Sequence, residues 1–145
     1  MIDLDDTDRA ILKALERDGG LSAAAVGALV GLSQPAAWRR IRRLEEGGVI
    51  LGRRIVLDRG KLGFDVVVYL GVKLGAKGRV SLEDFERAVS AIPEVQVVQH
   101  VLGIYDYRLK VVARDLSDFE RILRRRIMTL PGVGDVESNV LLSEG

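Results

Sequence analysis

The chain has 145 residues, of which 48% are hydrophobic, and its 22 basic and 21 acidic residues leave a net charge of +1. This content is sufficient for a packed core in one domain or two small ones, and the lack of cysteine excludes disulfides and cysteine-ligated metal sites. No apolar run is long enough to span a bilayer, and the acidic start MIDLDDTDRAI is unlike a targeting leader. We therefore expect a soluble cytoplasmic protein.

The first predicted helix covers residues 5–18. Asp5 or Asp6 can cap its N-terminus, because a side-chain oxygen accepts one of the free backbone N–H groups there. Gly19 and Gly20 follow and can end the helix. Three apolar residues at helical spacing form its stripe: Ile11, Leu12 and Leu15. The pattern predicts an amphipathic helix.

Residues 22–45, SAAAVGALVGLSQPAAWRRIRRLE, predict two short helices joined by a tight turn. Ser22 can cap the first helix and Ser33 the second, while Gly31 tolerates the left-handed conformation that ends the first. Pro35 fits a first helical turn, where its missing N–H is no loss. The residues expected to face inward are Val26, Leu29, Val30, Ala37, Trp38, Ile41 and Leu44. This spacing is typical of a helix-turn-helix.

The second of these helices carries a dense arginine face with no acid between Gln34 and Arg43. Arginine offers a fork of donors that fits phosphate oxygens and the guanine edge. The residues expected to face DNA are Ser33, Gln34, Ala36, Arg39, Arg40 and Arg43, with Arg42 nearby. An ordinary helical hairpin with solvated arginines is the alternative, and the helix-turn-helix spacing favours DNA binding instead.

A wing and a linker are expected after the helices. Residues 44–50, LEEGGVI, turn at Gly47 and Gly48 into a strand-like run, which is typical of a winged helix-turn-helix. We place the DNA-binding domain at residues 1–52 and a linker strand at residues 53–63. The basic side chains of the linker are expected to contact solvent rather than DNA.

The remaining residues, 64–145, predict an α+β domain in the order β-α-β-β-α-β. The strands are expected at 65–74, 95–102, 105–113 and 136–142, and the helices at 81–92, capped by Ser81, and 115–130, capped by Asp115. Two such halves give a ferredoxin-like four-stranded antiparallel sheet with both helices on one face. We expect apolar residues on the other face, covered by a partner subunit.

Several motifs together resemble the Lrp/AsnC, or feast/famine, family of transcription regulators. They are LDDTDRAIL at 4–12, GLS at 31–33, RRIRRLEEGGVI at 39–50, GIYDY at 103–107 and LPGV at 130–133. The resemblance covers nearly the whole chain. It implies homodimers formed through the C-terminal sheets, higher oligomers such as octamers, binding to double-stranded DNA, and no membrane association.

The resemblance also implies that an amino acid binds between C-terminal domains of neighbouring dimers. The family's ligand-contacting residues match Gly103, Ile104, Tyr105, Asp106, Tyr107 and Ser138, whereas Val136 departs from the hydroxyl residue common at its position. Physically, Gly103 allows a close approach to the backbone, Asp106 can take an ammonium group, and Tyr105 can pack against a side chain. The alternative is a tight hairpin in which Asp106 bonds the turn backbone.

Two other functions compete with this interpretation. Siroheme decarboxylases have a similar overall fold, but the one histidine, His100, is expected to be a packing or interface residue. There is no metal-ligand spacing, GxGxxG or P-loop, so we expect no enzyme activity, no cofactor and no metal. An architectural DNA-binding protein that ignores small molecules is the second alternative.

Overall fold

The computed structural model describes residues 2–75 and 82–145. The chain divides into two compact units, Met1–Leu57 and Asp58–Gly145. Across the described residues, no helix is both long enough and apolar enough to cross a membrane.

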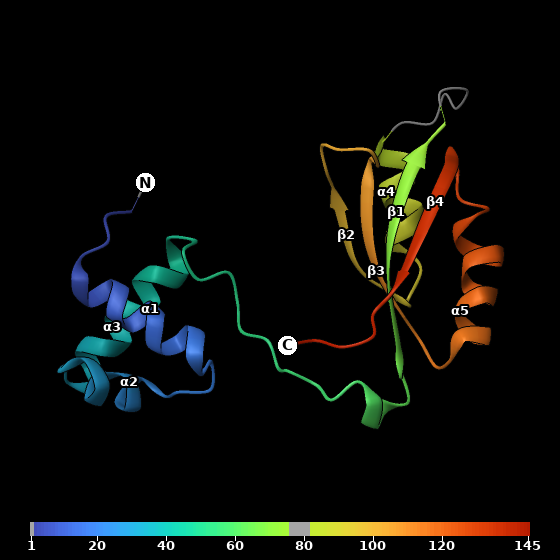
Figure 1. The fold of residues 1–145 in the computed structure, drawn as a ribbon. Coiled ribbons are helices and arrows are strands. Elements are labelled where there is room, and N and C mark those ends of the chain that lie inside the picture. Colours follow the sequence, from blue (N-terminus) through green and yellow to red (C-terminus); the bar gives the residue numbers. More distant parts are fainter. Residues whose placement is uncertain (1, 76–81) are drawn as a thin grey trace. The chain divides into compact units, whose positions relative to one another are not determined.

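The N-terminal unit consists of three helices, α1 (Asp6–Arg17), α2 (Ala23–Val30) and α3 (Gln34–Glu46), as Figure 1 shows. Each begins at a predicted cap. The Asp5 carboxylate accepts from the Asp8 N–H. In the same way, the hydroxyls of Ser22 and Ser33 each accept from the backbone N–H three residues later in the chain. The predicted helix-turn-helix is therefore confirmed.

A small apolar core holds these helices together. It is formed by Ile11, Val26, Ile41 and Leu44, with Ala37 buried beside them. The turn between α2 and α3 lies very close to Gly27, where an added Cβ would approach the Leu32 carbonyl oxygen to 2.6 Å. As predicted, Gly31 ends α2 in the left-handed conformation, with φ at 77°.

Two residues predicted to face inward are exposed instead. Leu29 on α2 is 67% exposed, and Trp38 on α3 is 52% exposed. Neither residue belongs to the apolar core of this unit.

The predicted wing and linker strands are absent, since residues 2–65 contain no strand. Val49 and Ile50 fold back on α3, where both backbone N–H groups donate to the Leu44 carbonyl. Most of the residues from 51 to 59 have no regular structure, and a short 3-10 helix, η1, follows at Gly60–Leu62. A strand requires a hydrogen-bonding neighbour, and one chain provides none here.

The C-terminal unit has the predicted ferredoxin-like order. The elements are β1 (Val66–Leu74), α4 (Leu82–Ser90), β2 (Val95–His100), β3 (Tyr107–Ala113), α5 (Leu116–Ile122), its π-helical continuation η2 (Leu123–Ile127) and β4 (Val133–Val140). The strands pair antiparallel in the order β2-β3-β1-β4, as Figure 1 shows. The predicted N-cap Ser81 lies outside the described residues.

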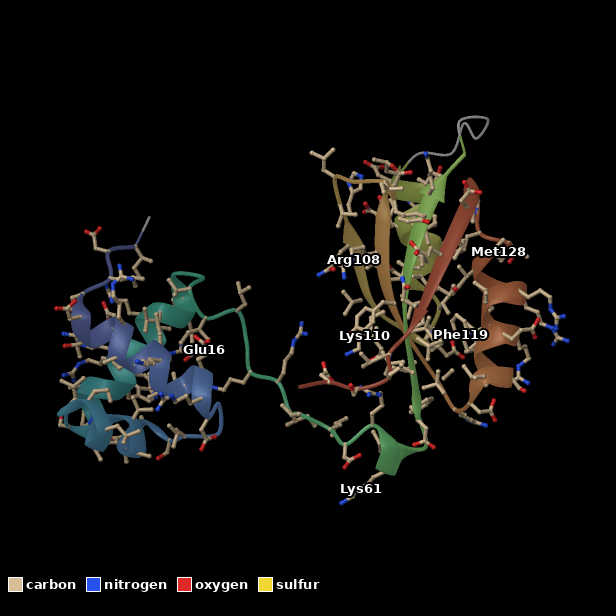
Figure 2. All side chains as sticks on the ribbon, viewed as in Figure 1. Glu16, Lys61, Arg108, Lys110, Phe119 and Met128 are labelled. Atoms are coloured by element: carbon tan, nitrogen blue, oxygen red, sulfur yellow. The ribbon has the colours of Figure 1, made fainter. Side chains whose placement is uncertain are left out.

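One face of this sheet packs against the helices. Alternate residues of β1 and β3, such as Leu70 and Leu109, form the core with Phe85 of α4 and Phe119 of α5. Figure 2 shows Phe119 pointing from α5 toward the sheet. Strand alternation places the intervening residues on the opposite face.

That opposite face carries apolar residues, as predicted, and charged residues as well. Arg108 and Lys110 extend from β3 away from the helices (Figure 2), and Glu137 on β4 shares their face, because Arg108 and Glu137 both pair with Gly71. Apolar residues such as Val67 and Val112 occur near one end of the ladder.

Candidate DNA-binding surface and effector site

The arginines of α3 fall into two groups. Arg40 and Arg43 turn toward α1. Arg40 Nη1 lies 2.8 Å from Asp5 Oδ2 and 3.1 Å from Asp8 Oδ1, and Arg43 Nη1 lies 3.0 Å from Asp8 Oδ2. The second amino group of Arg43 donates to the Asp3 carbonyl. Two arginines predicted to face DNA are therefore engaged within their own unit.

Asp8 is the centre of this network. It is only 1% exposed, and it also accepts the Asp5 N–H in the capping box. Burial raises the pKa of Asp8, but the hydrogen bonds from Asp5, Arg43 and Arg40 outweigh burial and lower that pKa overall. The Arg40 guanidinium lowers the pKa of Asp5 from 3.8 to about 2. Both carboxylates are thus ionised at neutral pH.

Arg39 and Arg42 point outward. Arg39 is exposed and makes no hydrogen bond or ion pair to any residue that the structure describes. Arg42 pairs at 3.1 Å with Glu46 one turn later, and its guanidinium carbon lies 5.7 Å from the centre of the Trp38 ring. Trp38 and Arg42 therefore lie together on the outward surface of α3. The sequence analysis missed Trp38 because it assigned this residue to the core.

The other predicted DNA contacts lie at the start of α3. Ser33 and Gln34 are exposed, and Ala36 is half-buried. The Ser33 hydroxyl accepts from the Ala36 N–H at 3.3 Å, which leaves its own proton free to donate. These residues remain predicted DNA contacts.

In the C-terminal unit, the predicted effector turn is fastened to β1 by Asp106. The Asp106 N–H donates to the Val72 carbonyl at 2.9 Å, and Asp106 Oδ2 accepts from the Leu74 N–H at 2.8 Å. The second carboxylate oxygen has no hydrogen-bond partner among the described residues. Asp106 therefore has both a structural contact and a free acceptor.

Gly103 and Ile104 lie at the exposed tip of the turn. Ile104 is 81% exposed. Gly103 does not have a positive φ, and a Cβ added to it would meet nothing within 4 Å. The fold of this chain therefore does not itself require glycine at position 103.

The two tyrosines of the turn differ in exposure, since Tyr105 is half-buried and Tyr107 is buried. Tyr105 covers Gly71 on the sheet, where a Cβ would approach its ring to 2.7 Å; burial, and then a hydrogen bond with Glu137, raise the pKa of Tyr105. Tyr107 is fully buried, and its hydroxyl donates to Glu86 Oε1 at 2.5 Å. Burial and Glu86 raise its pKa to about 12. The side chain of Tyr107 is thus unavailable at the surface of this subunit.

Ser138 lies on the other face of the sheet from the contacts of Tyr105. It is exposed on β4 opposite Leu70, whereas Tyr105 of the turn lies against Gly71 and Glu137. His100 stacks on Tyr107 with ring centroids 4.8 Å apart, the packing role expected for it. Within residues 2–75 and 82–145, no three His, Asp or Glu side chains are grouped so as to hold a metal.

Comparisons with known proteins agree with this architecture. The Lrp/AsnC ligand binding domain matches residues 67–144, and the AsnC-type helix-turn-helix domain matches residues 4–45. A proline dehydrogenase transcriptional activator of Rhizobium radiobacter is 39% identical over 97% of this chain and 90% of its own length. The leucine-responsive regulatory protein of Escherichia coli is 34% identical over 98% of this chain and 87% of its own length.

Among solved structures, the similar proteins are also transcriptional regulators. A transcriptional regulator of Neisseria meningitidis in complex with L-Met superposes with a TM-score of 0.93 at 27% identity, over 98% of this chain and 92% of that one. An AsnC family regulator of Agrobacterium tumefaciens has a TM-score of 0.88 at 33% identity, over 97% and 92%. These relatives are regulators and not enzymes. With both of its regions matched by family models, the chain belongs to the Lrp/AsnC family of DNA-binding transcriptional regulators.

Proposed function

We propose that this regulator acts in the cytoplasm as a homodimer or a larger assembly such as an octamer, and that an amino acid bound at Gly103–Tyr107 alters its binding to DNA. The observation that carries the effector site is Gly103. The backbone there is ordinary and the surrounding space is open, so the subunit alone gives no reason for a glycine. Close approach of a ligand or a second subunit supplies one.

Asp106 supplies the charge that an amino acid requires. Its Oδ2 atom is fixed by the Leu74 N–H, so the carboxylate is held in one orientation. The remaining oxygen is free to accept from an ammonium group. The solved complex of the Neisseria relative with L-Met is consistent with a ligand of this class.

The site is incomplete in one subunit. Ile104 is exposed at the tip, and Ser138 lies on the other face of the sheet from Glu137, the β4 residue that the turn contacts. A second subunit that places its own β4 beside the turn would complete the site. We therefore locate the ligand between subunits, where it can favour one assembly over another.

The open face of the sheet supports association of two copies. Arg108 and Lys110 form a basic strip on β3. The acidic Glu137 lies on β4, on the other side of β1 from this strip. A two-fold interface is self-complementary, so the basic strip of one copy can face the acid of the other. Two helix-turn-helix heads also need a dimer to reach successive major grooves, roughly 34–36 Å apart.

A thermal-shift screen against the twenty amino acids tests the effector site. A ligand held by the native state raises the melting temperature by mass action. We expect at least one amino acid to do so for the wild type and for a Glu144→Ala control, and none for Asp106→Ala. If no amino acid shifts the wild type, the protein is a ligand-independent DNA binder. If Asp106→Ala responds normally, the site lies elsewhere.

Light scattering on the full chain tests the assembly. We expect the mass of a dimer or a multiple of it, and a shift toward monomer in the Arg108→Glu/Lys110→Glu variant because that change places like charges across the interface. A monomeric wild type at micromolar concentration contradicts the proposal.

A further inference from the structure

We propose that α3 contacts DNA through a face formed by Trp38, Arg39 and Arg42, and that Arg40 and Arg43 are positioning residues that fix α3 on α1 through Asp8. This inference rests on the DNA-binding function and changes which arginines perform it. Two observations support it: α1 lies against Arg40 and Arg43 on one side of α3, and the ion pairs of the two groups differ in burial.

The position of α1 beside α3 separates the two groups of arginines. Successive residues are about 100° apart around an α-helix. The buried side of α3 is marked by Ala37, Ile41 and Leu44. Arg39 then falls opposite the core, whereas Arg42 and Arg43 fall about equally far from the core on the two sides of Arg39. The side that carries Arg40 and Arg43 is the side where α1 lies within ion-pair distance.

The ion pairs differ in how readily they exchange for phosphate. Arg42 and Glu46 are both at least half exposed, so their pair is screened and contributes little. Arg40 and Arg43 share Asp8, whose side chain is buried. Moving both arginines onto DNA would leave a buried carboxylate without its cationic partners, which is strongly unfavourable. Arg39 needs no rearrangement at all.

Trp38 adds an apolar patch to this face. Half of its surface is exposed, and the Arg42 guanidinium is held near its ring. An exposed indole beside two outward arginines can contact sugars or the thymine methyl while the arginines take phosphates or guanines. It is the chain's only tryptophan, so its fluorescence reports directly on this face.

Salt dependence of DNA affinity distinguishes the two groups. The probes are a duplex selected by the wild type from a random-sequence pool and an unselected duplex of the same length. For Arg39→Ala and Arg42→Ala we expect weaker binding and a salt slope reduced by about one for each lost phosphate contact. For Arg40→Ala and Arg43→Ala we expect an unchanged slope. The inference is overturned if the slope falls in the second pair of variants and not in the first.

Asp5→Asn gives a test that does not depend on removing an arginine. Asparagine is an equally good N-cap, so α1 still begins correctly, but Arg40 loses one of its carboxylates. Asp6→Asn, on an exposed neighbour, is the matched control for the change in net charge. We expect the two variants to bind the probes equally. Tighter binding by Asp5→Asn than by Asp6→Asn shows that Arg40 is released onto DNA and overturns the inference.

Trp38 fluorescence provides a third test of the proposed contact face. We expect duplex DNA to change the Trp38 emission of the wild type and of Asp5→Asn; unchanged emission on binding removes Trp38 from the contact face and contradicts the proposal. A wild type that binds neither duplex contradicts the DNA-binding function itself, an outcome distinct from a wild type that binds through Arg40 and Arg43.

Discussion

The two units of this chain are stabilised in different ways. The N-terminal unit has a small apolar core and fixes its recognition helix with a buried carboxylate shared by two arginines. The C-terminal unit has a large apolar core between one sheet face and two helices, with the Tyr107 hydroxyl and Glu86 as a polar contact at its edge. Charge therefore contributes to the geometry of the DNA-binding unit, and packing to that of the effector unit.

The two functional surfaces differ in the same way. The outward face of α3 is complete within one chain, because every element that orients it lies in the same unit. The proposed effector turn is fastened at Asp106, yet its tip is exposed and Ser138 lies on the other face of the sheet from the contacts of Tyr105. The proposed DNA contacts therefore lie within one subunit, whereas the proposed ligand site includes a second.

The largest effect on stability is expected from a substitution in the C-terminal core. Leu109→Ala should lower the free energy of unfolding of that unit by about 2–5 kcal/mol, because it leaves a cavity among fully packed side chains. Strand circular dichroism follows this unit in denaturant, and Trp38 fluorescence follows the other. The Trp38 transition should stay in place, as should both transitions in the exposed control Leu142→Ala. A Trp38 transition that moves with Leu109→Ala shows that the units do not unfold separately.

The next largest effect is expected from a substitution in the ion-pair network around Asp8. Asp8→Asn should cost the N-terminal unit about 1–3 kcal/mol, since Arg40 and Arg43 lose their shared carboxylate but remain partly solvated. The Trp38 transition measures the loss. Asp6→Asn, which changes the same charge on the exposed side of α1, should change it much less. Equal losses in both variants indicate a general helix-dipole effect instead of a specific network.

The pH dependence of the two units should have opposite signs. Asp5 has a folded pKa of about 2 against an ordinary 3.8, so its contribution is present above pH 3.8 and is lost as pH falls toward 2. Tyr107 has a raised pKa of about 12 against 10.0, so its contribution is present below pH 10 and is lost as pH rises toward 12. Trp38 fluorescence should respond to acid and strand circular dichroism to alkali. An Asp5→Asn variant with undiminished acid sensitivity contradicts this role of Asp5.

The smallest effect on stability is expected at the turn. Gly103→Ala should change the free energy of unfolding by no more than about 0.5 kcal/mol, because the backbone is ordinary and the space is open. It should nevertheless abolish the amino-acid response. Gly52→Ala, at another open position with an ordinary backbone, is the control for both measurements. A normal ligand response in Gly103→Ala removes the reason for placing the ligand there.

Local chemistry made much of the fold predictable. The caps at Asp5, Ser22 and Ser33 and the left-handed Gly31 are set by neighbours within three or four residues, and all four are confirmed. The ferredoxin-like order followed from strand and helix periodicity in the same way. Strand ends were less predictable: β2 ends at His100 and β3 begins at Tyr107, because the turn is stabilised by Asp106 contacts with β1.

The side-chain partners within the N-terminal unit could not be predicted from local sequence. Arg40 and Arg43 meet carboxylates more than thirty positions earlier in the chain, which no helical pattern reveals. Trp38 was assigned to the core by its hydrophobicity, although the helix turns it outward beside Arg42. The prediction of wing and linker strands was wrong, because β-branched residues form a strand only where a neighbouring strand can pair with them. No helical pattern distinguishes Arg42 from Arg43, because both lie near Arg39 around the helix.

A crystal structure of the full chain on its selected duplex tests the division of labour on α3 most directly. We predict that Arg40 and Arg43 remain within hydrogen-bonding distance of Asp8, while Arg39 and Arg42 contact phosphates or base edges and Trp38 lies against the duplex. Arg40 and Arg43 detached from Asp8 and bonded to DNA, with Arg39 and Arg42 in solvent, would contradict the account.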